Sequence, residues 1–288
     1  GCSSLKNIVI PSSVKYIGKN VFNGCYSLVQ IEIPSSVNSL GNNVFAGCSS
    51  LQKISIPDSV DSIGNHAFLD CISLKEINID PMKTKSQSNS FENCSSLSLL
   101  NIQSKNNKID KYNHQSFTNI DKIIISNNIT NIGDNSFYNL KQVKEIIIPN
   151  SVTIIGNTSF AGCTSLTHIE IPSTVTSIGN FAFSNCSSLI QVIIPSSVKS
   201  IGSNVFENCT SLKNVTNLSS ILKIENGMFN KCNSLVNLAI PLSVNSIGND
   251  AFRDCSSLNK IEIPSSVISL GENCFSGCSS LNEIIIPS

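Results

Sequence analysis

The sequence predicts a solenoid, a fold in which short repeats stack and each repeat packs only against its neighbours. Cysteines recur at steps of 23 residues, from Cys2 to Cys94 and again from Cys163 to Cys278. The gap between Cys94 and Cys163 is 69 residues, which is three such steps. Proline, glycine and phenylalanine each recur at fixed places within the same repeat. A single repeat of this length cannot bury its own apolar side chains, but a stack of repeats can.

The repeat reads C-S-S-L-x-x-I-x-I-P-S-S-V-x-x-I-G-x-x-x-F-x-x. The segment L-x-x-I-x-I predicts a strand with one buried face, because its apolar residues alternate. Proline ends this strand because it lacks a backbone N–H, and the two serines favour a turn. The segment V-x-x-I predicts a short second strand. The following glycine indicates positive φ or close packing, and N-x-x-F predicts a single helical turn that directs phenylalanine into the core.

This pattern resembles the 23-residue leucine-rich repeat of the BspA-like surface antigens, and the resemblance covers essentially the whole chain. It implies a leucine-rich repeat solenoid of α/β type, a right-handed horseshoe or arc of about twelve and a half repeats. It also implies a parallel β-sheet on the concave face, with short strands and single helical turns on the convex side. Surface display and adhesion to host proteins or other cells are further implications of the resemblance. The family brings no catalytic motif with it.

The amino-acid composition argues against nucleic-acid binding and membrane insertion as functions of this chain. The chain has 288 residues with 19 basic and 19 acidic side chains, a formal net charge of +0. This balance argues against nucleic-acid binding and against a polybasic membrane contact. The longest apolar runs are three residues, such as Val192 to Ile194, so we expect no transmembrane helix and no membrane insertion.

We expect residues 1–288 to form one solenoid domain, uncapped at both ends and part of a longer chain. Two stretches depart from the repeat, residues 80–116 and residues 214–228. In the first, Lys83 occupies the valine column, His114 the phenylalanine column and Phe117 the cysteine column. Because several apolar anchors are missing there, we expect the stretch from Asp80 to Ser116 to be looser or bulged.

The 12 cysteines raise two sharper possibilities, metal binding and disulfides. Zinc sites need clustered ligands, whereas this spacing gives one cysteine per repeat. Side chains in one column run parallel, which suits a disulfide poorly. We therefore expect a buried column of free thiols, no metal and no cofactor. His66, His114 and His168 fall in different columns, and no Gly-x-Ser-x-Gly motif occurs, so the sequence predicts no enzyme and no catalytic residue.

The outward-facing positions of the L-x-x-I-x-I strand offer a candidate protein-binding patch. These positions hold apolar residues at Leu99, Ile124, Ile147 and Ile193. An exposed apolar patch of this kind marks contact sites in other proteins, although β-branched residues also simply favour strands. The expected ligand is an extracellular matrix or cell-surface protein.

Glycosylation sequons do not by themselves show secretion. Asn-x-Ser/Thr occurs seven times, at Asn93, Asn128, Asn157, Asn185, Asn208, Asn214 and Asn217. With 37 Asn and 62 Ser plus Thr in the chain, chance alone gives about eight such motifs.

Two function classes therefore remain in view. The first is a cell-surface or secreted adhesion module, favoured by the family resemblance. The second is a cytoplasmic protein-interaction scaffold, favoured by unbonded thiols.

Overall fold

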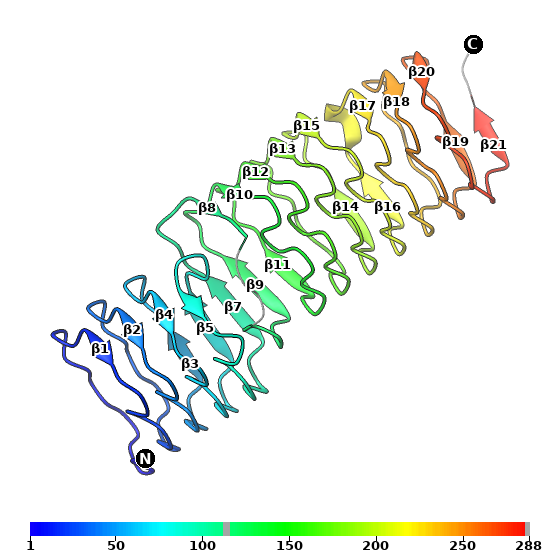
Figure 1. The fold of residues 1–288 in the computed structure, drawn as a ribbon. Helices are drawn as coiled ribbons and strands as arrows, with labels where there is room; N and C mark the ends of the chain where they lie inside the picture. The colour runs from blue at the N-terminus through cyan, green and yellow to red at the C-terminus, as the bar shows by residue number, and fades with distance from the viewer. Residues whose placement is uncertain (112–115, 286–288) are drawn as a thin grey trace. The chain divides into compact units, whose positions relative to one another are not determined.

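The computed structural model describes residues 1–111 and 116–285, and its strands form parallel sheets (Figure 1). The described chain divides into two compact units. The N-terminal unit contains residues 1–106 and the described part of 112–128. The C-terminal unit contains residues 107–111 and the described part of 129–288.

The L-x-x-I-x-I segments form the longer strands. In the N-terminal unit these are β3 (Lys53–Ser55), β5 (Glu76–Ile79), β7 (Leu99–Ile102) and β9 (Lys122–Ile125). In the C-terminal unit they are β11 (Glu145–Ile147), β14 (Gln191–Ile193), β16 (Asn214–Thr216), β19 (Lys260–Glu262) and β21 (Glu283–Ile285). Residues paired between adjacent strands are 23 apart in the sequence, as in Ile54 with Ile77. The predicted period therefore sets the sheet register.

The V-x-x-I segments form the predicted second strands, each two residues long. The N-terminal unit has β1 (Tyr16–Ile17), β2 (Ser39–Leu40), β4 (Ser62–Ile63) and β6 (Lys85–Ser86). The C-terminal unit has β8 (Lys108–Ile109), β10 (Asn131–Ile132), β12 (Ile154–Ile155), β13 (Ser177–Ile178), β15 (Ser200–Ile201), β17 (Lys223–Ile224), β18 (Ser246–Ile247) and β20 (Ser269–Leu270). Between the two strands of a repeat, the valine N–H donates to the proline carbonyl, as Val175 does to Pro172 at 3.0 Å.

The predicted helical turn at N-x-x-F is wrong. The segment is a run of turns, and the only helix in the described chain is the 3₁₀ helix η1 (Leu218–Ser220). Two positions in the run adopt left-handed backbone, as Asn20 (φ 62°) and Gly24 (φ 70°) do in the first repeat. Left-handed residues interrupt a right-handed helix, and asparagine, aspartate and glycine tolerate this conformation best.

The glycine column is explained by close packing and not by positive φ. A Cβ added to Gly179 would lie 2.5 Å from the backbone nitrogen of Asn157 in the preceding repeat. The residue after the glycine is commonly asparagine, and its amide oxygen links consecutive repeats. The Asn157 Oδ1 accepts from the backbone N–H of Asn180 at 2.8 Å, and the Asn180 Oδ1 accepts from that of Ser203 at 2.8 Å. The glycines let these turns approach closely enough for the asparagine ladder to form.

Phenylalanine rings stack through the core of each unit, as expected. Phe160 and Phe183 lie 5.2 Å apart between centroids with an interplanar angle of 1°. Phe117 was expected in the cysteine column, but its ring stacks on Phe91 at 5.5 Å. Phe117 therefore supplies the ring that its irregular repeat would otherwise lack. His114, which sequence counting assigned to that column, lies outside the described residues.

Candidate binding surface

The outer faces of the longer strands carry the candidate site. Along β3 the middle residue Ile54 is 1% exposed, while Lys53 and Ser55 are exposed. The same alternation holds along β14, where Val192 is buried between two exposed neighbours. This is the pattern that a strand with one core-facing side requires, and it confirms the predicted alternation.

In the N-terminal unit this face carries a polar network. The Lys53 Nζ lies 2.7 Å from Glu76 Oε1, and these residues are directly paired between β3 and β5. The Asn101 Nδ2 donates to the same Glu76 oxygen at 2.5 Å and to Asn78 Oδ1 at 2.7 Å. Neighbouring side chains on one face of a sheet lie within reach of each other, so these groups fix one another across three strands.

Leu99 and Ile124 border this network and are half-buried. The register pairs Leu99 with Lys122 and Ile124 with Asn101, so the two apolar side chains occupy diagonal positions on adjacent strands. The structure therefore places both on the predicted face, beside polar groups.

In the C-terminal unit the predicted residues are more open. Ile147 is 40% exposed and Ile193 is 60% exposed. Glu170, which is also exposed, occupies the same column in the repeat between them. The two predicted apolar side chains of this unit are thus separated by a carboxylate, and they do not form one continuous apolar patch.

A groove in the N-terminal unit was not predicted. Three adjoining hollows of about 590, 580 and 720 Å³ share lining residues. Glu32 lines the first two, and Ser35 and Ser55 line the second and third. The groove follows the end of the longer strands, where proline begins the turn, from Asn7 to Asn106. The first two hollows lie along the outward-facing columns of the L-x-x-I-x-I segments, and the third extends over the irregular turn after Asp80.

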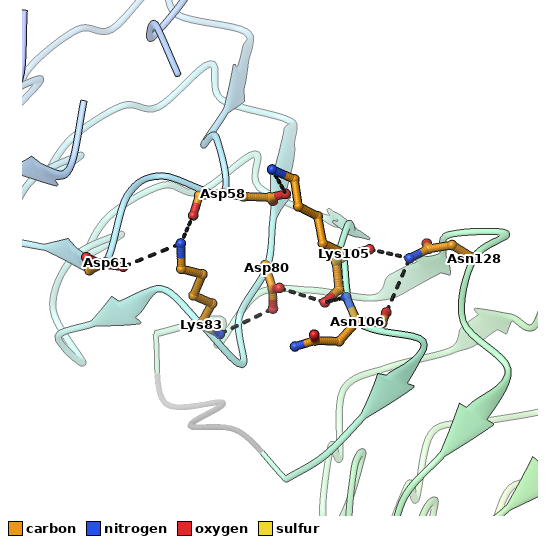
Figure 2. A network of polar contacts seen from close by, with 8 residues as sticks. Asp58, Asp61, Asp80, Lys83, Lys105, Asn106 and Asn128 are labelled. Carbon is orange, nitrogen blue, oxygen red and sulfur yellow. Dashed lines mark hydrogen bonds and ion pairs between the residues drawn. The ribbon is translucent and has the colours of Figure 1, made fainter. Parts of the chain in front are cut away.

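A polar network lines the last of these hollows (Figure 2). Asp80 is 3% exposed, and its Oδ1 accepts from the backbone N–H groups of Met82 at 3.1 Å and Lys83 at 3.2 Å. Its Oδ2 accepts from the Ser104 hydroxyl at 2.7 Å. These three donors satisfy the buried carboxylate, as a buried charge requires.

The lysines at the rim of this hollow are paired with acidic side chains. Lys83 Nζ lies 3.5 Å from Asp61 Oδ1 and also donates to the Asp58 carbonyl, while Lys105 Nζ lies 3.6 Å from Asp58 Oδ2. Exposed pairs of this kind contribute little to stability. They place two lysines and two aspartates at the rim of this hollow.

The turn at Asp80 is one residue longer than in regular repeats. Thr84 donates its backbone N–H to Asp80, four residues back, whereas Val60 donates to Pro57, three residues back. Thr84 is buried and its hydroxyl donates to the Val60 carbonyl at 2.8 Å. Lys83, expected in the valine column, is exposed instead. Hydrogen bonds thus replace the missing apolar anchor, and the longer turn frees Lys83 for the groove.

The cysteine column is buried, as predicted. All 12 cysteines are free, and Cys2 and Cys278 are the members that are not buried. From the third repeat onward the column thiol donates to the backbone carbonyl of the phenylalanine 26 residues earlier; the Cys209 thiol, for example, donates to the Phe183 carbonyl at 3.1 Å. Burial raises the pKa of Cys163 from 9.0 to about 12. A thiol with such a pKa stays protonated near neutral pH and is a poor nucleophile or metal ligand.

This pKa makes stability depend on alkaline pH. Above pH 9 the unfolded chain loses the Cys163 proton while the folded chain keeps it, until the pH reaches about 12. The folded state then binds more protons, so the free energy of unfolding falls as pH rises through this window. We expect Cys163→Ala to make that fall shallower by about 1.4 kcal/mol per pH unit. Urea unfolding between pH 9.5 and 11 measures the slope, and equal slopes in wild type and Cys163→Ala would contradict the assignment.

The histidines within the described residues do not share a site. His66 Nε2 lies 3.0 Å from Glu92 Oε2, and His168 Nδ1 lies 3.1 Å from the Thr167 hydroxyl in the other unit. In residues 1–111 and 116–285, no three His, Cys, Asp or Glu side chains are placed to hold a metal ion. The same residues include no helix with the length and hydropathy needed to cross a membrane.

A known protein family matches this chain over its whole length. The family described as BspA type leucine rich repeat region matches in six copies, over residues 1–120, 107–235 and 210–288. A leucine-rich repeat protein from Bacteroides ovatus is 28% identical, with a TM-score of 0.56, over 98% of this chain and 73% of that one. A leucine rich cell surface protein from Faecalibacterium prausnitzii is 27% identical, with a TM-score of 0.48, over 99% of this chain and 88% of that one. No curated protein sequence matches.

Proposed function

Because the chain belongs to the BspA-type leucine-rich repeat family, we propose that it is a non-catalytic protein-binding module, displayed on a cell surface or secreted, that mediates adhesion. Its ligand is an extracellular matrix or cell-surface protein. The observation that carries the proposal is the outer face of the longer strands, which presents exposed and half-buried side chains on regular backbone. A binding surface on regular elements holds its contact groups in fixed positions and so loses little entropy on binding.

The two units offer different contacts on this face. The N-terminal unit offers a groove with an exposed carboxylate at Glu32 and paired charges at Asp58 and Lys105. The C-terminal unit offers Ile147 and Ile193 on either side of Glu170. We propose that residues 1–288 act as one repeat domain and that Leu99, Ile124, Ile147 and Ile193 contact the ligand, with polar groups setting specificity.

The free thiols favour the alternative, a cytoplasmic scaffold, because disulfides are rare in the cytosol. Their burial weakens that argument. A thiol that is 0% exposed, as Cys186 is, and bonded to a carbonyl is shielded from thiols in solution in either compartment. The thiols are therefore compatible with both locations, and the family membership favours the surface.

Localisation is tested first, by labelling intact producing cells with a membrane-impermeant biotin reagent. We expect this protein among the labelled proteins, with a cytosolic enzyme as the unlabelled control. Protection of the protein until the cells are lysed would overturn surface display and leave the scaffold.

The contact surface is tested with Ile147→Asp combined with Ile193→Asp. Both side chains are exposed, so the double variant should fold with unchanged stability. We expect it to reduce adhesion of protein-coated beads to host cells or matrix at least about tenfold, because a charge at an apolar contact is left desolvated. Ile190→Asp is the matched control, since Ile190 is 45% exposed but lies outside the outer-face columns. Equal adhesion by the wild type, the double variant and the Ile190→Asp control would exclude Ile147 and Ile193 from the contact surface.

A further inference from the structure

The seven sequons differ in the hydrogen bonding and surroundings of their asparagine side-chain amides. In four of them the asparagine Nδ2 already donates a hydrogen bond. Asn93 donates to Asp70 at 2.9 Å, Asn128 to the Asn106 carbonyl at 3.2 Å, Asn185 to Ser184 at 2.9 Å and Asn208 to Asn185 at 2.8 Å. An N-linked sugar replaces one of the two amide hydrogens and needs open space around the nitrogen. These four groups are therefore poorly placed to carry one in the folded protein.

Two of the remaining three sequons are constrained in other ways. Asn157 holds its oxygen in the asparagine ladder, and the hydroxyl residue of its sequon, Ser159, is 0% exposed. Asn214 and Thr216 lie on β16, which pairs in register with β14. A bulky group at Asn214 would stand directly on the sheet face.

Asn217 differs from both. It follows β16 in the column where other repeats bury isoleucine, such as Ile194, which is 0% exposed. Its left-handed backbone (φ 64°) turns the side chain out to solvent, and the next residue, Leu218, is buried in its place at 4% exposure. Asparagine is one of the few residues that adopt this conformation readily. The irregular stretch thus replaces a core side chain with an exposed amide on a turn.

The amide of Asn217 is also oriented. The hydroxyl of Ser219, the third residue of the same sequon, donates to Asn217 Oδ1 at 3.1 Å. This bond holds the amide oxygen, and within the described chain the Nδ2 has no hydrogen-bond partner. The nitrogen is therefore the end of the amide that remains available.

We propose that Asn217 is an N-glycan acceptor. In this step the Asn217 Nδ2 displaces the diphosphate of a lipid-linked oligosaccharide at the anomeric carbon of its first sugar. A carbon–nitrogen bond forms, the carbon–oxygen bond to the diphosphate breaks, and the amide proton leaves to the base of the transferring enzyme. The inference rests on the proposed function, since this transfer takes place on the secretory route. A glycan here would stand beside the end of β16 and border the outer face of the C-terminal unit.

The test is secretion of the full chain from a eukaryotic host that attaches N-glycans, followed by glycopeptide mass spectrometry of the folded monomer. We expect Asn217 to carry a glycan in most molecules. Asn217→Gln and Ser219→Ala should each remove the corresponding glycosidase-sensitive shift in gel mobility. Asn157→Gln, the matched control, should leave that shift unchanged.

An unmodified Asn217 in the secreted folded protein, or occupancy concentrated at Asn128 or Asn157, would overturn the inference. Ser219→Ala keeps the asparagine and guards against a folding defect of the glutamine variant. Biotin labelling of producing cells reports separately on the proposed function. A surface-labelled protein from cells that attach N-glycans, but with Asn217 unmodified, would exclude the acceptor while leaving adhesion standing.

Discussion

Replacing Phe183 by alanine is expected to lower the free energy of unfolding by about 3–5 kcal/mol. Phe183 is 0% exposed, and its ring stacks on Phe160 at 5.2 Å and on Phe206 at 5.7 Å. Its deletion removes contacts on both sides of the repeat and leaves a cavity that the rigid neighbours cannot fill. Denaturant unfolding followed by circular dichroism measures the loss.

Phe181 provides a matched control two residues away. It is 39% exposed and lies in left-handed backbone (φ 56°), which phenylalanine adopts less readily than asparagine does. We expect Phe181→Asn to change stability by less than about 0.5 kcal/mol or to increase it. A loss below about 1 kcal/mol for Phe183→Ala, or equal losses for both variants, would contradict the core assignment.

The ring column was predictable because burial in a solenoid follows sequence period directly. Every regular repeat places phenylalanine at the same distance from its cysteine, so counting residues was enough to place Phe183. Counting failed at Phe117, where side-chain packing moved a ring out of its counted column to stack on Phe91. An aromatic ring in a gap of the stack is worth more than strict register in an irregular turn.

The turns were harder to predict than the strands. Asparagine and glycine at the left-handed positions were visible in the sequence, as at Asn20 and Gly24, and could have excluded the helical turn. Their columns also contain His66 and Phe181, which obscure the signal. The conformation follows from bonds to the next repeat, such as Phe22 N–H to the Val44 carbonyl at 2.8 Å, which no local pattern encodes.

The sequence predicted which residues face outward on the candidate surface, but not how far they are buried or how they are hydrogen-bonded. Alternation identified the outward residues, including Ile193, because it depends on strand geometry alone. The partial burial of Leu99 and the amide pair of Asn78 and Asn101 depend on groups one repeat apart. The part of the groove around Asp80 depends on a turn that is one residue longer than in the regular repeats. Repeat counting shows that this stretch is irregular, but it does not predict the conformation of the turn.

Replacing Gly179 in the glycine column by alanine is expected to lower the free energy of unfolding by about 1–3 kcal/mol or more. The added Cβ would lie 2.5 Å from the Asn157 nitrogen and 2.7 Å from the Gly156 carbonyl carbon. Both are backbone atoms that no side-chain rotation can move, so the two repeats must separate. Separation would also lengthen the 2.8 Å bond from the Asn180 N–H to Asn157 Oδ1, adding a lost hydrogen bond to the strain.

Gly18 tests this explanation because it occupies the same column without the contact. An alanine Cβ there would meet Tyr16 at 3.6 Å, an ordinary side-chain contact, and φ at Gly18 is not positive. Gly18→Ala should therefore be neutral or stabilise by about 0.4–1 kcal/mol, since alanine restricts the unfolded chain. Urea unfolding should show a loss of stability for Gly179→Ala and no loss for Gly18→Ala if inter-repeat approach selects glycine. Losses of similar size at both positions would show that a local backbone requirement selects it instead.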